Sequence, residues 1–193
     1  MEEWDILDRN GKFTGRRVTR NRVVLARGDY HLVVHIWVVG SDGRILIQRR
    51  SDTKPLMPGE WAATGGAAIS GESSLQAAKR ELFEELSIEM NVRNTRFVKR
   101  LIRRNSLLDI YLVRCNTPTN ELKIQKEEVA EVKRVHINHL KRMIKTGKFH
   151  NYGKEYFDTV FNAIAPRSKR HFYNHKNKSE KDNGKAKNTM SGL

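Results

Sequence analysis

Residues 66 to 88 read GAAISGESSLQAAKRELFEELSI, and this stretch predicts a glycine loop that leads into an amphipathic helix. Ser73, followed three residues later by Gln76, forms a capping-box pattern that marks the start of the helix. An apolar stripe follows from residues that recur every three or four positions, namely Leu75, Ala78, Leu82 and Leu86. We therefore expect a helix over residues 73 to 86 with one buried face.

Three carboxylates, those of Glu81, Glu84 and Glu85, fall to one side of this stripe. At these spacings the side chains of a helix are neighbours, so the three acids repel one another. The simplest interpretation is an acidic face in water, but the glycine loop in front of the helix lets backbone atoms approach a ligand closely. Hard oxygen ligands suit Mg²⁺ or Mn²⁺. The pattern therefore predicts a site for one of these ions.

The same stretch resembles the signature of the Nudix hydrolase family. The matching residues are Gly66, Glu72, Arg80, Glu81, Leu82, Glu84, Glu85 and Ile88. Ser87 departs from the signature, which has a glycine there to end the helix. At positive φ a residue other than glycine costs about 1–2 kcal/mol. The resemblance implies an α+β fold, a Nudix-type α/β/α sandwich with a mixed sheet, and hydrolysis of the diphosphate linkage of a nucleoside diphosphate derivative.

The resemblance also implies roles for individual residues. The metal ligands would be the carbonyl oxygen of Gly66 and the carboxylates of Glu81, Glu84 and Glu85. Arg80 would hold the carboxylates in orientation through Glu72 or Glu84. The general base stays open between Glu81 and an acid after the signature, and the candidates there are Glu127, Glu128 and Glu131, with Glu128 singled out.

Substrate phosphates require cations, and Arg49 and Arg50 end a predicted strand that leads into the glycine loop. Trp61 lies shortly before Gly65 and is a candidate for stacking on a base, although a buried anchor is an equal alternative. His31 and His35 lie on one strand and face the same way, which is typical of core histidines. We therefore expect Arg49, Arg50 and Trp61 to contribute to substrate binding.

A second resemblance extends over residues 3 to 165 and points to the Nudix branch that includes isopentenyl-diphosphate isomerase. That isomerase needs a cysteine and a metal-binding histidine beside the first glycine of the signature, where this chain has Gly65 and Ala67. The hydrolytic acids are intact, so the sequence favours hydrolysis. An isomerase-like enzyme and a non-catalytic nucleotide- or RNA-binding module remain as alternatives.

The composition is that of one enzyme domain followed by a basic tail. The chain has 193 residues and a net charge of +15. Residues 166 to 193 carry eight Lys or Arg and two acids, a net charge of +6, and we expect this tail to be disordered and either solubilising or in contact with RNA. Residues 1 to 165 form the predicted Nudix domain. The sequence leaves open whether the protein is a monomer or a homodimer.

The location is expected to be cytoplasmic. The first residues, MEEWDILDRN, contain no secretion signal, and no apolar run approaches the roughly 20 residues that a membrane helix needs. Cys115 is the single cysteine and has no partner for an internal disulfide. It lies in an apolar strand and is expected to pack there as a small hydrophobic residue.

The remaining elements surround the acidic helix. The segments WDILD (4 to 8) and FTGRRVTR (13 to 20) flank Asn10-Gly11, a strong hairpin signal. Further strands are expected over residues 31 to 39, 44 to 50, 92 to 104, 107 to 115 and 129 to 137. Further helices are expected over residues 139 to 146, capped by Asn138, and 154 to 164.

Overall fold

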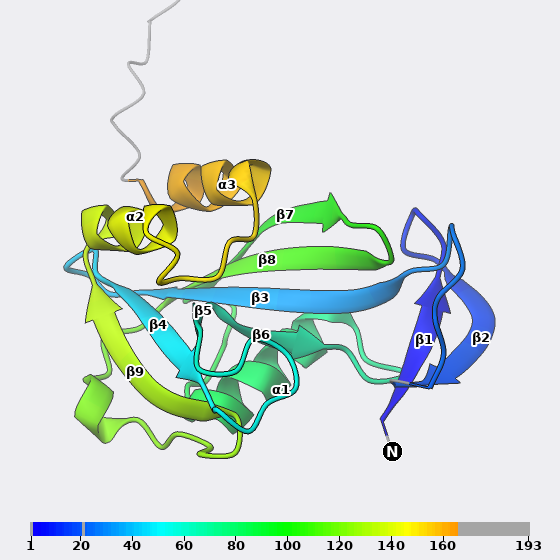
Figure 1. Ribbon diagram of the computed structural model, residues 1–193, viewed down its shortest axis with the longest axis horizontal. Coiled ribbons are helices and arrows are strands. Elements are labelled where there is room, and N and C mark those ends of the chain that lie inside the picture. The colour runs from blue at the N-terminus through cyan, green and yellow to red at the C-terminus, as the bar shows by residue number, and fades with distance from the viewer. Residues whose placement is uncertain (1, 21, 166–193) are drawn as a thin grey trace, which may run out of the picture.

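The computed structural model describes residues 2 to 20 and 22 to 165, and it shows a mixed sheet between helices (Figure 1). Its strands are β1 (Glu3–Leu7), β2 (Phe13–Thr19), β3 (His31–Val39), β4 (Ile45–Arg50), β5 (Trp61–Ala62), β6 (Thr64–Ala67), β7 (Thr95–Ile102), β8 (Ser106–Arg114) and β9 (Val129–Val135). Its helices are α1 (Ser74–Leu86), the short 3₁₀ helix η1 (Thr119–Glu121), α2 (Ile137–Lys145) and α3 (Lys154–Ile164).

The main sheet has seven strands in the order β5-β4-β3-β8-β7, with β6 paired to β3 and β9 paired to β4. The β3–β8 pair is parallel and the other pairs are antiparallel, so the sheet is mixed. Helix α1 covers one face, and α2 and α3 cover the other (Figure 1). The predicted α+β sandwich is confirmed.

Alternation along the central strands divides the core between the two faces. On β3, Val34, Ile36 and Val38 belong to the cluster under α1, whereas Trp37 and Val39 belong to the cluster under α2 and α3. These strands read as continuous apolar runs because both of their faces are buried.

Helix α1 begins and ends largely as its sequence predicts. The Ser73 hydroxyl and the Gln76 side chain form the capping box, and the backbone of Ser87 is left-handed with φ 52°. One expectation was wrong: Leu75 in the first turn is 37 % exposed, and the buried face instead includes Ala77 and Glu85. The apolar stripe is therefore shorter by one turn, and it contains a carboxylate.

Two further expectations differ from the structure. The stretch before α1, expected as a loop, contains the short strands β5 and β6. Asn138 does not cap α2, because α2 starts at Ile137, which packs against the core, and His136 is the N-cap residue. The predicted tail, residues 166 to 193, lies outside the described residues. Within those residues, no helix is long and apolar enough to cross a bilayer.

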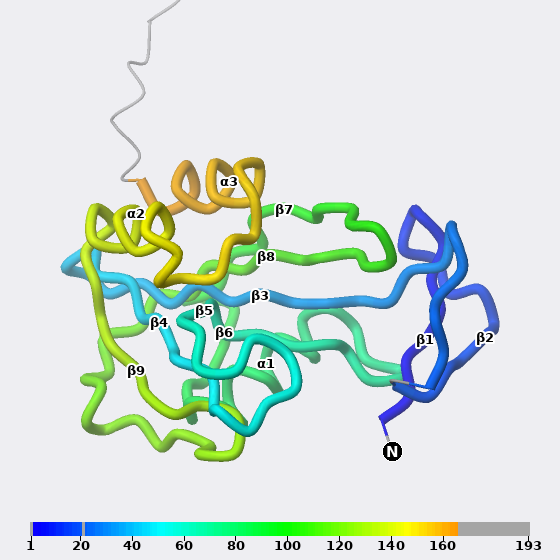
Figure 2. The backbone as a smooth tube through the Cα atoms, viewed as in Figure 1, coloured from blue at the N-terminus to red at the C-terminus, as the bar shows by residue number. Residues whose placement is uncertain are grey.

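The hairpin β1–β2 is fixed to the segment that leads into α1. The Asp5 carboxylate accepts hydrogen bonds from the Ser70 hydroxyl at 2.7 Å and from the Gly71 N–H at 2.9 Å. The Trp4 ring stacks on His31, with 4.0 Å between the ring centroids. Figure 2 shows the hairpin beside the first residues of β3 and close to the loop before α1. The hairpin thus lies next to the acidic helix.

Candidate active site

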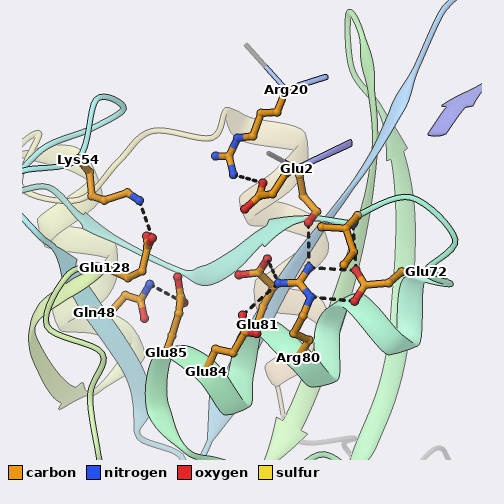
Figure 3. Close-up of polar contacts among 12 residues, drawn as sticks. Glu2, Arg20, Gln48, Lys54, Glu72, Arg80, Glu81, Glu84, Glu85 and Glu128 are labelled. Carbon is orange, nitrogen blue, oxygen red and sulfur yellow. Dashed lines mark hydrogen bonds and ion pairs between the residues drawn. The ribbon is translucent and has the colours of Figure 1, made fainter. Parts of the chain in front are cut away.

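Arg80 on α1 organises the acidic residues around it (Figure 3). Its Nε and one terminal nitrogen donate to the two carboxylate oxygens of Glu72 at 2.8 and 3.0 Å. The other terminal nitrogen donates to Glu81 at 2.9 Å and to Glu84 at 3.1 Å. The hydrogen bonds to Glu72 raise the pKa of Arg80, with the nearby charge of Glu81 adding to them. The predicted role of Arg80 in orienting carboxylates therefore has a geometric basis.

Glu81 lies directly against Gly66. A Cβ atom added to Gly66 would come within 2.4 Å of the Glu81 carboxylate, so only glycine leaves room for it. Burial raises the pKa of Glu81, the charges of Glu84 and Glu128 raise it further, and Arg80 opposes the change. The first glycine of the signature thus brings a backbone segment and a carboxylate into contact.

Glu85 is buried, with 3 % of its surface exposed. It accepts a hydrogen bond of 3.0 Å from the Gln48 amide, whose oxygen accepts one of 2.9 Å from the Thr64 hydroxyl. Burial raises the pKa of Glu85 to about 8, against the opposing effect of the Gln48 hydrogen bond, and the charges of Glu81 and Glu128 contribute in the same direction as burial. A cation bound beside Glu85 would offset the repulsion between its carboxylate and those of Glu81 and Glu128.

Glu128 approaches the same group from the segment before β9. Its carboxylate pairs with Lys54 at 2.5 Å, and its charge acts on both Glu81 and Glu85. The other two acids of this segment lie elsewhere: Glu131 pairs with Arg49 at 3.7 Å, and Glu127 is exposed. Of the three candidates, the structure brings Glu128 to the acids of α1.

The predicted substrate-binding residues divide between the two faces of the sheet. Arg49 pairs with Asp52 at 3.3 Å and lies opposite Trp61 in the β4–β5 register. The Trp61 ring packs against the cluster under α2 and α3, with the Lys133 ammonium 3.7 Å from its centroid. Arg50 donates to the Leu56 carbonyl at 2.9 Å, and its charge acts on Glu85. The structure therefore places Trp61 on the face away from the acids, and it shows no ion pair between Arg50 and an acid within the described residues.

The histidines and the cysteine belong to the framework. His35 is partly buried, its Nδ1 is 2.8 Å from the Tyr156 hydroxyl, and burial lowers its pKa to about 3. Cys115 packs against the cluster under α1, and its thiol donates to Thr117. Both observations agree with the structural roles that the sequence suggested.

Three residues of this arrangement were not predicted as site residues, namely Gln48, Lys54 and Thr64. Gln48 is a polar residue inside an apolar strand, which is the one signal in the sequence that could have identified it. Lys54 lies in a loop of polar and apolar residues, and Thr64 comes directly before Gly65 and Gly66. Their roles depend on β6 lying close to β4 and on β9 pairing with β4. A single sequence reveals neither arrangement.

The side chains suit a hard divalent cation. Within residues 2 to 20 and 22 to 165, no three acidic, histidine or cysteine side chains already form a metal cluster. Arg80 instead donates to Glu81 and Glu84. The charge of Glu128 raises the pKa of both Glu81 and Glu85. Carboxylate oxygens near a glycine backbone are the donor type that Mg²⁺ and Mn²⁺ prefer. Glu84 is half-exposed and paired with Arg80 at 3.1 Å, so it would have to leave that ion pair to reach such an ion.

Comparison with known proteins identifies the family of this chain. A model of the NUDIX domain matches residues 29–157. An uncharacterised Nudix hydrolase of Listeria monocytogenes is 35% identical over 153 residues, which cover 79% of this chain and 90% of that protein. Nudix hydrolase 3 of Arabidopsis thaliana is 36% identical over 154 residues, which cover 69% of this chain and 19% of that protein.

Solved structures share the fold. The protein DR0079 of Deinococcus radiodurans superposes with a TM-score of 0.70 at 22% identity, covering 83% of this chain and 98% of that one. The NUDIX domain of Shewanella oneidensis NrtR, complexed with ADP ribose, superposes with a TM-score of 0.56 at 15% identity, covering 76% of this chain and 94% of that one. The signature, the domain match and the curated relatives together establish that this chain belongs to the Nudix hydrolase family, whose members act on pyrophosphate-containing substrates.

Proposed function

We propose that this protein hydrolyses the diphosphate linkage of a nucleoside diphosphate derivative with the help of Mg²⁺ or Mn²⁺. The observation that carries the proposal is that the Glu81 carboxylate lies against Gly66 and accepts from Arg80, while the charges of Glu81 and Glu128 act on buried Glu85. The ligands would be the carboxylates of Glu81, Glu84 and Glu85 and the Gly66 carbonyl oxygen. A divalent ion there supplies positive charge that neutralises the phosphate oxygens.

The reaction consumes one water molecule. The water oxygen attacks one phosphorus, the bond from that phosphorus to the bridging oxygen breaks, and the bridging oxygen leaves with the electron pair. The products are a nucleoside monophosphate and the phosphorylated second group. A base must accept a proton from the water.

We assign the base to Glu128 and the orienting role to Arg80. Glu128 lies across from the α1 carboxylates, where it pairs with Lys54 at 2.5 Å and accepts no hydrogen bond from Arg80. Glu81 already accepts from Arg80 and lies against the Gly66 backbone, which suits a ligand better than a base. The two hydrogen bonds from Arg80 to Glu72 fix the plane of the guanidinium and, through it, the position of Glu81.

The geometry of Gly65 opposes the isomerase alternative. A Cβ atom added to Gly65 would come within 2.1 Å of the Val34 carbonyl oxygen, because β6 pairs closely with β3 there. The cysteine that the isomerase reaction needs therefore has no room at this position. Hydrolysis requires no side chain there.

The test is phosphate or pyrophosphate release from a panel of nucleoside triphosphates, nucleoside diphosphates and ADP-ribose. We expect activity with MgCl₂, no activity with EDTA, and a loss of at least about 100-fold in Glu85→Gln, since even residues that only orient metal ligands contribute 10–100-fold. Glu89→Gln is the matched control, because Glu89 is an exposed acid just beyond the helix. Full turnover by Glu85→Gln would refute the site.

The assignment of the base has a separate readout. Glu128→Gln should lower kcat and flatten the acidic side of its pH profile while the Mg²⁺ concentration for half-maximal rate stays similar. Glu81→Gln should raise that Mg²⁺ concentration. The reverse pattern would exchange the two roles.

A further inference from the structure

A cleft of about 880 Å³ lies beside the acids, and the N-terminal hairpin builds one of its walls. Its lining comes from the hairpin, from the loop after β4, from the loop before α1 and from the segment before β9: Glu2, Glu3, Arg20, Lys54, Pro55, Ile69, Ser70 and Glu128. The volume lies in the range of small-molecule binding sites. One end of the cleft therefore reaches Glu128, and the other reaches the hairpin.

This wall lies outside the residues that the NUDIX model matches. The model matches from residue 29 onward, whereas β1 ends at Leu7 and β2 ends at Thr19. The hairpin is nevertheless held rigidly, because Asp5 accepts two hydrogen bonds from Ser70 and Gly71, and the Ser70 N–H donates to the Glu3 carbonyl at 2.8 Å. Its side chains can thus take fixed positions in the cleft.

Arg20 is the cation of this wall. It pairs with Glu2 at 2.5 Å, and its guanidinium carbon lies 5.9 Å from the Trp4 ring centroid. Figure 3 shows Arg20 and Glu2 on one side of the view, Lys54 and Glu128 on the other, and the α1 carboxylates below them. The Arg20 and Glu2 side chains are 39 % and 49 % exposed, so their ion pair contributes little and can open. A phosphate offers Arg20 a bidentate partner instead.

We propose that Arg20 binds a terminal phosphate of the substrate and thereby selects nucleoside tri- or diphosphates over derivatives whose second group is neutral. The proposal rests on the proposed function, which places bond cleavage at the acids near the other end of the cleft. Glu2 competes with the phosphate for Arg20 and so weakens its binding.

The test compares kcat/KM for ATP with kcat/KM for ADP-ribose in three variants, because these two substrates share the same base. Arg20→Gln should lower the ratio of the two values about tenfold or more, because a hydrogen bond to a charged group is lost. Glu2→Gln should raise the same ratio about two- to fivefold, because an exposed competing pair is removed. Arg16→Gln is the matched control: it removes a hairpin charge that pairs with Asp29 outside the cleft lining.

If the hairpin had only a structural role, Arg20→Gln and Glu2→Gln would not shift the ratio of the two kcat/KM values in opposite directions. Equal losses on both substrates in Arg20→Gln, or identical behaviour of Arg20→Gln and Arg16→Gln, would overturn the proposal. If the wild-type protein hydrolyses neither substrate, the proposed function fails, and tripolyphosphate binding measured by calorimetry decides the role of Arg20 separately. Weaker binding in Arg20→Gln than in Arg16→Gln would support the phosphate site, and equal binding would overturn it.

Discussion

The two faces of the central sheet are built from alternate residues of the same strands, yet they differ in chemistry. Under α2 and α3, the Tyr156 hydroxyl accepts from the Trp37 indole at 2.9 Å and meets His35, within a cluster of aromatic rings. Under α1, the buried groups include Glu85 and Gln48. The first face satisfies its polar atoms internally, whereas the second concentrates carboxylates whose charges oppose one another.

We infer that the face under α2 and α3 stabilises the fold, whereas the face under α1 carries the reactive groups. An aromatic core with paired hydroxyl and indole groups lowers the free energy of the folded state. A buried carboxylate that is not fully compensated raises it. A protein retains such a destabilising carboxylate where a bound ligand interacts with it. We therefore expect substrate and metal to bind at the face under α1.

The largest test of this contrast is Phe149→Ala on the α2 and α3 face. Phe149 is 2 % exposed and contacts Trp37, Tyr152 and Phe157. Its removal should cost about 3–5 kcal/mol in the free energy of unfolding, measured with urea, because a large cavity is left. Phe83→Ala on α1 is the control, since Phe83 is 55 % exposed, and it should change stability little. Equal effects of the two changes would break the contrast.

Acid should weaken the protein through its buried histidines. Burial lowers the pKa of His31 from 6.5 to about 4, with the charge of Arg20 adding to the effect, and lowers that of His35 to about 3. The unfolded chain therefore binds more protons, and stability is lost as the pH falls from about 6.5 toward 4. His31→Gln should reduce the fall measured between pH 7 and pH 4 by on the order of 2–3 kcal/mol.

The control for this pH dependence is His139→Gln, since His139 is exposed on α2. It should leave the slope of stability against pH as in the wild type. A wild-type protein whose unfolding free energy is flat from pH 7 to pH 4 would contradict the prediction.

The smallest expected effect lies at the end of α1. Ser87→Gly should stabilise the protein by about 1 kcal/mol, because the backbone there is left-handed and glycine adopts that conformation without strain. Loss of the 3.3 Å hydrogen bond from Ser87 to the Lys123 carbonyl offsets part of the gain. Thermal unfolding measures the change, and activity should follow wild type. A lower melting temperature would show that this hydrogen bond outweighs the strain.

The acidic helix and the hairpin could be predicted from sequence because their signals are local. Ser73 and Gln76 mark the helix start, and Asn10-Gly11 marks the turn. The partners of the helix could not be predicted, since Gln48 reaches Glu85 through strand pairing between distant segments. The contribution of the hairpin was also missed, because the position of Arg20 in the cleft depends on how Asp5 binds Ser70 and Gly71.

The face of the sheet on which Trp61 lies could not be predicted from the sequence either. A tryptophan next to a glycine loop is compatible with either a base-stacking or a core role. The side of the sheet that it faces depends on the register of β5 against β4. A shift of one residue in that pairing would have exchanged the faces.

The tight pairing at Gly65 also constrains what a substitution at this position can do. A cysteine introduced there would press on the Val34 carbonyl oxygen, so β6 would have to move away from β3 before the new thiol could be used. That single substitution would therefore change the path of a strand as well as one side chain, and we expect it not to give this protein the isomerase activity.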